Sequence, residues 1–142
     1  MSQSAIIFPA LCQAVLTLVI LIVMGWARAR SMRALSQKID DSDVRLGQNT
    51  WTEEATKVSN NYKNQYEVPV LFYAVVGLAL ALKLADPLMI GLAWVFALTR
   101  VVHSILHIGP NSVPSRGLFF LIGVVAVLAM WLVLGWRVAT GV

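Results

Sequence analysis

Long apolar stretches without a charged residue constrain this chain more than any other feature of its sequence. Residues 5–26 and residues 117–136 contain no Asp, Glu, Lys or Arg. About 20 consecutive apolar residues are enough for a helix to cross the hydrocarbon core of a bilayer. The chain is also 58% hydrophobic and only 13% charged, which excludes a typical soluble domain. We therefore expect an all-α integral membrane protein, a single four-helix transmembrane domain over residues 1–142.

Turn and capping signals divide the chain into four predicted helices. The predicted helices cover residues 5–27, 51–84, 87–108 and 115–137, with a polar cytoplasmic loop over 28–50. The motif Thr50-Trp-Thr-Glu53 fits a capping box at the start of the second helix, and Pro69 is expected to kink that helix. Pro87 is a favourable first residue for the third helix, and the segment 109–114, rich in Gly and Pro, ends it.

The basic residues indicate how the helices are oriented. Arg28, Arg30 and Arg33 follow the first apolar stretch, and no Lys or Arg precedes it. This charge order is the reverse of a signal peptide, and the positive-inside rule places the following loop in the cytoplasm and the N-terminus outside. Membrane topology therefore explains the net charge of +4, and we expect no nucleic-acid partner. The expected location is the inner membrane of a bacterium, with an organelle membrane as the alternative.

The third predicted helix carries three polar side chains within an apolar sequence. Arg100, His103 and His107 are spaced i, i+3 and i+7, so they share one face of the helix. A charged side chain at membrane depth is costly unless it faces the protein interior or water and has a partner. The sequence therefore predicts that this face is turned into the bundle.

A second polar stripe lies on the preceding helix. Its members recur with helical spacing and are Asn60, Lys63, Asn64 and Glu67. Counting from the turn between the two helices places Glu67 at a depth between Arg100 and His103, so hydrogen bonding or ion pairing between the two stripes is expected. Two interpretations remain open: a structural salt bridge between the helices, or a binding site formed by both stripes together with Arg116.

The order and spacing of these residues resemble a known family. The segments Asn64-Gln-Tyr-Glu67 and Arg100-x-x-His103-x-x-x-His107, followed by Arg116, are similar to motifs of a bacterial-type MAPEG protein. The MAPEG proteins are membrane-associated proteins of eicosanoid and glutathione metabolism, and the resemblance extends over essentially the whole chain. It implies a homotrimer with glutathione bound between neighbouring subunits near the cytoplasmic side.

The resemblance also implies roles for individual residues. Arg116 is the implied catalytic residue, because a nearby cation lowers the pKa of a thiol and so supplies the nucleophilic thiolate of glutathione. Arginine binds carboxylates bidentately, and a carboxylate such as Glu67 pairs with the ammonium group of glutathione. The implied glutathione-binding residues are Asn60, Lys63, Asn64, Glu67, Arg100, His103 and His107.

The implied function is that of a glutathione-dependent transferase or peroxidase acting on lipophilic small molecules among the membrane lipids. The alternative is a non-enzymatic binding or accessory protein, because Asn60 stands where catalytic members usually have arginine and His107 where they often have an aromatic hydroxyl. A proton pathway through the histidines is disfavoured, because residues 87–99 offer no ionisable group to continue it. A zinc site formed by His103, His107 and Glu67 is a further alternative, but such spacing is common on polar helix faces, and we expect no metal ion.

Overall fold

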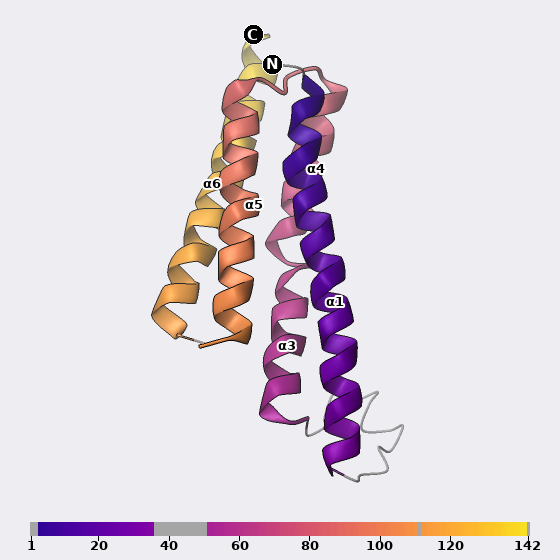
Figure 1. Ribbon diagram of the computed structural model, residues 1–142. Coiled ribbons are helices and arrows are strands. Elements are labelled where there is room, and N and C mark those ends of the chain that lie inside the picture. The colour runs from indigo at the N-terminus through magenta and orange to yellow at the C-terminus, as the bar shows by residue number, and fades with distance from the viewer. Residues whose placement is uncertain (1–2, 36–50, 111, 142) are drawn as a thin grey trace.

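The protein consists of helices packed side by side along one direction (Figure 1). The computed structural model describes residues 3–35, 51–110 and 112–141. Within these ranges the elements are η1 (Gln3–Ile6, a 3-10 helix), α1 (Ile7–Leu35), α3 (Glu53–Asn64), α4 (Val68–Ala81), α5 (Pro87–Ile108) and α6 (Val113–Thr140). In Figure 1, α1 runs beside α3 and α4, and α5 runs beside α6. The described residues contain no strand, so the predicted all-α fold class is confirmed.

Three helical segments are long and apolar enough to cross a membrane. Within the described ranges they are Gln3–Ala34, Pro87–Ile108 and Val113–Thr140. With 14 residues, α4 is about 21 Å long, so the second expected crossing also needs the segment that precedes α4. The prediction of an integral membrane protein is thereby confirmed.

The second predicted helix is divided in two, which corrects the expectation of one kinked helix over 51–84. Helix α3 ends at Asn64 and α4 begins at Val68, with Pro69 in the first turn of α4. Inside a helix, proline has no N–H to donate, and its ring collides with the carbonyl four residues earlier, here that of Gln65. In a first turn neither defect matters, because those N–H groups have no partner within the helix. The chain therefore starts a new helix instead of bending one.

The first helix extends further than its apolar sequence predicts. Helix α1 continues through the basic segment to Leu35, and the first part of the predicted polar loop 28–50 is therefore helical. Residues 36–50 of that loop lie outside the described ranges. Arg28 lies above the ring of Trp51, 5.3 Å from its centroid, which joins the extension of α1 to the segment before α3.

Side-chain caps and prolines mark the starts of the other helices. The N-cap of α3 is Thr52, whose hydroxyl accepts a backbone N–H at 3.4 Å, and not the expected Thr50. Asp86 is the N-cap of α5 and accepts a backbone N–H at 2.9 Å. Pro87 and Pro114 lie in the first turns of α5 and α6, where their fixed φ suits the helix.

Apolar side chains from α4, α5 and α6 fill the largest part of the interior. The rings of Phe72 and Phe96 are fully buried and stack with their centroids 4.3 Å apart. Helices α5 and α6 approach closely at Gly123, where an added Cβ would lie 3.1 Å from Thr99 Oγ1. Small residues at such crossings permit the close packing that holds helices together in a bilayer. This packing fixes the start of α6 relative to the end of α5.

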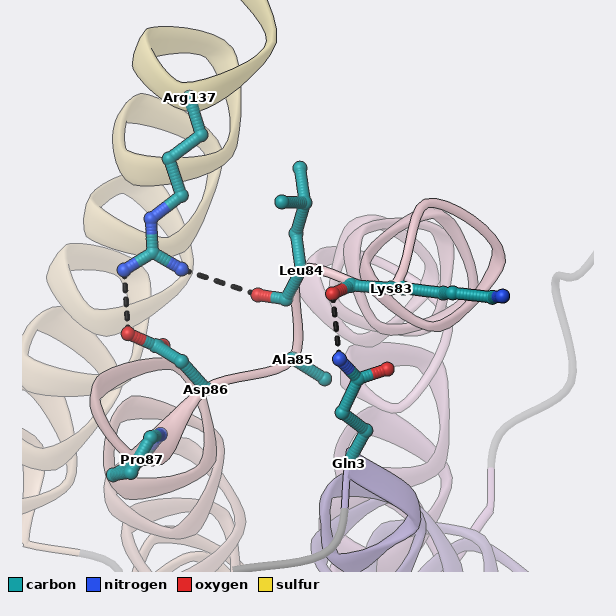
Figure 2. A pocket seen from close by; sticks show the side chains of 7 residues that line it. All are labelled: Gln3, Lys83, Leu84, Ala85, Asp86, Pro87 and Arg137. Atoms are coloured by element: carbon teal, nitrogen blue, oxygen red, sulfur yellow. Dashed lines mark hydrogen bonds and ion pairs between the residues drawn. The ribbon is translucent and has the colours of Figure 1, made fainter. Parts of the chain in front are cut away.

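The turn between α4 and α5 is tied to both ends of the described chain (Figure 2). Arg137 of α6 forms an ion pair with Asp86 and donates a hydrogen bond to Leu84 O at 3.1 Å. Gln3 Nε2 donates a hydrogen bond to Lys83 O at 2.7 Å. A pocket of about 380 Å³ lies among these residues. The contacts hold η1, the α4–α5 turn and α6 together at one end of the bundle.

Candidate functional site

Helix α5 presents its polar side chains to the interior, as its sequence predicts. Arg100, His103 and His107 are buried, with 1%, 3% and 6% of their surfaces exposed. Ser104 is buried beside them, whereas Ile105 on the opposite side of the helix is exposed. Helix α5 therefore has a polar inner face and an apolar outer face, the arrangement expected for a helix at membrane depth.

Arg100 binds the end of α3. Its Nη2 donates a hydrogen bond at 2.8 Å to the carbonyl of Asn64, the last residue of that helix. Because α3 ends at Asn64, its last carbonyls lack the N–H groups that a continued helix would supply. These carbonyls carry partial negative charge. The guanidinium carbon also lies 5.8 Å from the ring centroid of Phe120. Nε and Nη1 of Arg100 are buried and have no hydrogen-bond partner among the described residues.

Of the contacts expected between the two polar stripes, the structure has the hydrogen bond from Arg100 to Asn64, whereas Glu67 only attracts Arg100 from a longer range. Glu67 is exposed, and none of the ion pairs among the described residues joins it to Arg100. In a continuous helix Glu67 would follow Asn64 on the same face. The backbone instead leaves helical geometry at Glu67, with φ −86° and ψ −90°, so the two side chains no longer form one stripe.

The two histidines connect α5 to the start of α6. His103 Nδ1 lies 2.8 Å from the carbonyl of Arg116, and this nitrogen carries the proton because a carbonyl only accepts. Arg116 Nη1 lies 3.5 Å from His107 Nε2, which is the acceptor because a guanidinium only donates. His103 Nε2 and His107 Nδ1 are buried and have no hydrogen-bond partner in the described part of the chain. Each ring therefore has one nitrogen held by α6.

Within one chain the structure brings together part of the predicted site. The residues that meet where α5 and α6 join are Arg100, His103, His107 and Arg116. Asn64 is half-buried and joins them through its backbone carbonyl. The exposed members of the predicted set are Asn60, Lys63 and Glu67. The outer face of α3 and the break between α3 and α4 thus present polar side chains that the described part of the chain does not cover.

A buried polar network joins α1, α3 and α5, and its members are not among the predicted site residues. The network consists of Gln13, Asn61, Gln65 and Ser104, each at most 2% exposed. Gln13 Nε2 donates to Gln65 Oε1 at 2.9 Å, and Gln65 Nε2 donates to Ser104 Oγ at 3.1 Å. Ser104 Oγ in turn donates to Asn61 Oδ1 at 3.2 Å. The sequence signal for the network is weak: an i, i+4 amide pair beside the more conspicuous charged stripe, and one glutamine within an apolar stretch.

An apolar cavity of about 340 Å³ opens between α1 and α4, beside the segment that connects α3 to α4. The lining residues are Ala14, Thr17, Leu18, Gln65, Tyr66, Val70 and Tyr73. At its edge the hydroxyl groups of Tyr62 and Tyr66 are 2.9 Å apart. Gln65 belongs both to the cavity wall and to the polar network, so a single side chain separates the cavity from the buried amides.

The zinc site considered from the sequence has no support in the described residues. They contain no group of three or more His, Cys, Asp or Glu placed to hold a metal ion. His103 and His107 are buried on α5, whereas Glu67 is exposed between α3 and α4. The arginine and imidazole groups of the cluster can form hydrogen bonds and stabilise negative charge.

The fold and the cluster together define a class, that of helical membrane proteins with a buried Arg and His site near one end of the bundle. The sequence model of the MAPEG family matches residues 6–136, nearly the whole chain. The chain belongs to the MAPEG family and is a membrane protein of the family of glutathione and eicosanoid metabolism. The resemblance to the MAPEG family inferred from the motifs is thereby confirmed. No individual curated protein and no solved structure matches the chain at a significant level.

Proposed function

We propose that the protein is a glutathione-dependent transferase or peroxidase that acts on lipophilic electrophiles and works as a homotrimer. The observation that carries this proposal is the state of Arg100, which is buried and, among the described residues, forms a hydrogen bond only through Nη2. Nε or Nη1, together with the second N–H of Nη2, presents an edge that matches the two oxygens of a carboxylate. Family membership makes a glutathione carboxylate the best candidate for that anion.

The remaining predicted residues suit the other groups of glutathione, which carries two carboxylates, an ammonium group, two amides and a thiol. Lys63 suits the second carboxylate, Glu67 the ammonium group, and Asn60 or Asn64 an amide. The first two side chains are exposed on one chain. A site between neighbouring subunits would cover them and complete the set of partners.

Arg116 is the proposed catalytic residue. Its contact with His107 Nε2 and the bond from His103 to its carbonyl place it at the start of α6, beside the buried cluster. A cation close to sulfur favours the thiolate over the thiol, and partial exclusion of water strengthens that attraction. The thiolate attacks the electrophilic carbon of the second substrate, so that a C–S bond forms and the leaving group departs with its bonding electrons.

The apolar cavity between α1 and α4 gives the lipophilic substrate class a place to bind. Its walls are mainly aliphatic and aromatic side chains, and its volume of about 340 Å³ suits a small apolar molecule or part of a larger one. It lies beside the segment between α3 and α4, next to Glu67 and the exposed polar residues of α3. A lipophilic electrophile could therefore reach this position from the bilayer.

The proposal is tested by adding glutathione to the purified protein and recording the ultraviolet absorbance of the thiolate. Wild type is expected to show the absorbance, and Arg116→Ala is expected to lose it while retaining part of the glutathione affinity measured by calorimetry. Arg30→Ala is the matched control, because the Arg30 side chain is 65% exposed and lies on the extension of α1. Absence of both glutathione binding and thiolate absorbance in wild type would refute the proposal.

A non-enzymatic accessory role is the second candidate. It is favoured by the structural bonds of the cluster, because Arg100 caps α3 and His103 is bonded to the backbone of α6. These bonds would hold the helices together even in a protein without catalysis. Glutathione binding without any thiolate absorbance, together with no turnover of electrophilic substrates, would favour this alternative.

A further inference from the structure

Gln65 has an unusual position for a residue outside regular structure. It follows the last residue of α3, in the short segment between α3 and α4, and yet only 2% of its surface is exposed. Its amide oxygen accepts a hydrogen bond from Gln13 of α1, and its amide nitrogen donates to Ser104 of α5. The same nitrogen lies 3.3 Å from both the carbonyl and Oδ1 of Asn61 in α3. One side chain therefore links three helices at the break.

These contacts leave the Gln65 amide little freedom. In a poorly hydrated interior, a buried amide that turns away from its partners leaves both itself and those partners unpaired, which is costly. The bond from Gln13 fixes the oxygen side of the amide, and Ser104 fixes the nitrogen side. The position of the break relative to α1 and α5 is therefore set by side-chain hydrogen bonding as well as by Pro69.

The network lies one helical turn from the contact that holds Arg100. Asn61 contacts Ser104, and Asn64 contacts Arg100, so successive contacts advance along α3 while they step back along α5. Two antiparallel helices linked at neighbouring turns have a defined register. A shift at the Gln65 contact would move the Asn64 carbonyl away from the guanidinium and change the direction of its remaining N–H groups.

We propose that Gln65 is a positioning residue of the glutathione site. It holds α3 and α5 in the register that directs the guanidinium of Arg100 toward that site. This inference rests on the proposed function. Gln65 acts on the site indirectly, by fixing the position of Arg100 and of the segment between α3 and α4. Its side chain also forms part of the wall of the apolar cavity. It therefore couples the polar site to the place assigned to the lipophilic substrate.

The test compares Gln65→Met with Gln3→Met. Methionine keeps the length of the side chain and removes both hydrogen-bonding groups of the amide. Gln3 is a matched control, because it also donates a hydrogen bond, to Lys83 O, but at the end of the bundle shown in Figure 2. Ser104→Ala is a milder variant that removes one partner of Gln65, and it carries the test if Gln65→Met does not fold.

The first measurement does not depend on glutathione. Spin labels are attached at Thr56→Cys on α3 and Ile105→Cys on α5, two exposed positions, in a Cys12→Ser chain. Labelled chains are diluted with unlabelled ones so that distances within one chain dominate. Gln65→Met is expected to shift or broaden the distance distribution, and Gln3→Met to leave it unchanged. An unchanged distribution in Gln65→Met and Ser104→Ala would overturn the proposal.

The second measurement is the affinity for glutathione by calorimetry on unlabelled variants. Gln65→Met is expected to raise the Kd about tenfold, because small displacements of a binding group are costly, and Gln3→Met is expected not to change it. A shifted distance distribution with wild-type affinity, or lost affinity without a shift, would also overturn the positioning role. Failure of wild type to bind glutathione would refute the proposed function instead, while the distance measurement would still report whether Gln65 sets the register.

Discussion

Arg100 shows, at the scale of single residues, how a cation buried at membrane depth can be held by a helix end and not by an ion pair within the described part of the chain. The end of α3 offers carbonyls with partial negative charge, and the carbonyl of Asn64 accepts a hydrogen bond from the guanidinium. The face of Phe120 lies near the guanidinium carbon and adds a weaker attraction. Neither partner neutralises the positive charge, so the residue can still bind an anion.

The two functions of Arg100, capping α3 and binding an anion, can be separated by substitution. Arg100→Met is expected to destabilise the protein by about 1–3 kcal/mol, because the carbonyl of the half-buried Asn64 at the end of α3 loses its donor. Arg100→Lys should retain much of the stability but lose glutathione affinity, because an ammonium lacks the planar fork of arginine. Melting in detergent and calorimetric titration measure the two effects, with Arg30→Met as the exposed control. Equal glutathione affinity in Arg100→Lys and wild type would argue against a carboxylate at this position.

Asp86 is a second residue with separable contributions, because it both caps α5 and pairs with Arg137. The hydrogen bond from Arg137 lowers the pKa of Asp86 below its ordinary value. A lowered pKa stabilises the folded state at pH values above the ordinary aspartate pKa of about 4, and this stability is lost as the pH falls through the lower folded value.

Asp86→Asn should keep the helix cap and lose the charge. At neutral pH we expect a loss of about 0.5 kcal/mol, since the pair is partly exposed and screened by solvent. The difference in melting temperature from wild type should shrink as the pH is lowered below about 4. Asp86→Ala should lose about 1 kcal/mol more at every pH, because alanine cannot cap the helix. A difference between wild type and Asp86→Asn that does not change with pH would exclude the ion pair as its cause.

At the scale of elements, the break between α3 and α4 interrupts the backbone of the second predicted helix. Up to Asn64 the chain follows α3, whose inner face carries Asn61, and after the break Pro69 and the apolar residues of α4 continue into the bundle. Gln65 is buried between them, while Tyr66 and Glu67 point outward. Burial nevertheless keeps a helical period across the break, since Asn61, Gln65 and Pro69 are buried at intervals of four residues.

The sequence predicts the inner face of α5 because that face follows from helical period and from the cost of exposing arginine and histidine to lipid. It does not predict the break, because Pro69 is compatible both with a kinked helix and with the first turn of a new one. The Gln13, Gln65 and Ser104 contacts depend on how three helices meet, and no local pattern encodes that arrangement. Of the two contacts expected between the stripes, the ion pair of Glu67 with Arg100 is not formed among the described residues, because the backbone leaves helical geometry at Glu67.

The packing of α5 against α6 gives a prediction for a glycine. Gly123→Ala should destabilise the protein by about 1–3 kcal/mol through overpacking. The new Cβ would lie 3.1 Å from Thr99 Oγ1, and this hydroxyl is held by its hydrogen bond to Phe96 O. Gly91→Ala, where nothing lies within 4 Å of the new Cβ, should be neutral or stabilising by up to about 1 kcal/mol.

Melting temperatures in one detergent compare the two glycine variants with wild type. Thr99→Ala in the Gly123→Ala chain should restore part of the lost stability, because it removes the colliding oxygen and the γ-methyl group. Equal losses in Gly123→Ala and Gly91→Ala would show that helix propensity or the detergent, and not the contact between α5 and α6, determines the effect.

At the scale of the whole molecule, the described chain has a polar interior near one end and a polar strip on its outside. The strip consists of Asn60, Lys63 and Glu67, all exposed. Elsewhere the exposed surface of the long helices is largely apolar, as at Ile22 of α1 and Leu132 of α6. An apolar surface is stable in contact with lipid, whereas polar side chains near membrane depth are stabilised by protein or water. The strip is therefore the part of the surface that a neighbouring subunit is best suited to cover.

We therefore expect a homotrimer in which the polar strip of each chain faces a neighbouring subunit and the outer sides of α1 and α6 face lipid. Native mass spectrometry of the detergent-solubilised protein should give three times the chain mass of 15.6 kDa.

In a Cys12→Ser chain, Lys63→Cys should form covalent dimers with a short cysteine cross-linker, and Leu132→Cys, 65% exposed on α6, should not. Glu67→Gln should weaken the trimer more than it lowers the melting temperature of the isolated chain, because within the described chain Glu67 has only a longer-range attraction to Arg100 and no ion pair. A monomer at all protein concentrations, or cross-linking through position 132 instead of 63, would show that the polar strip is covered by something other than a second copy of the chain.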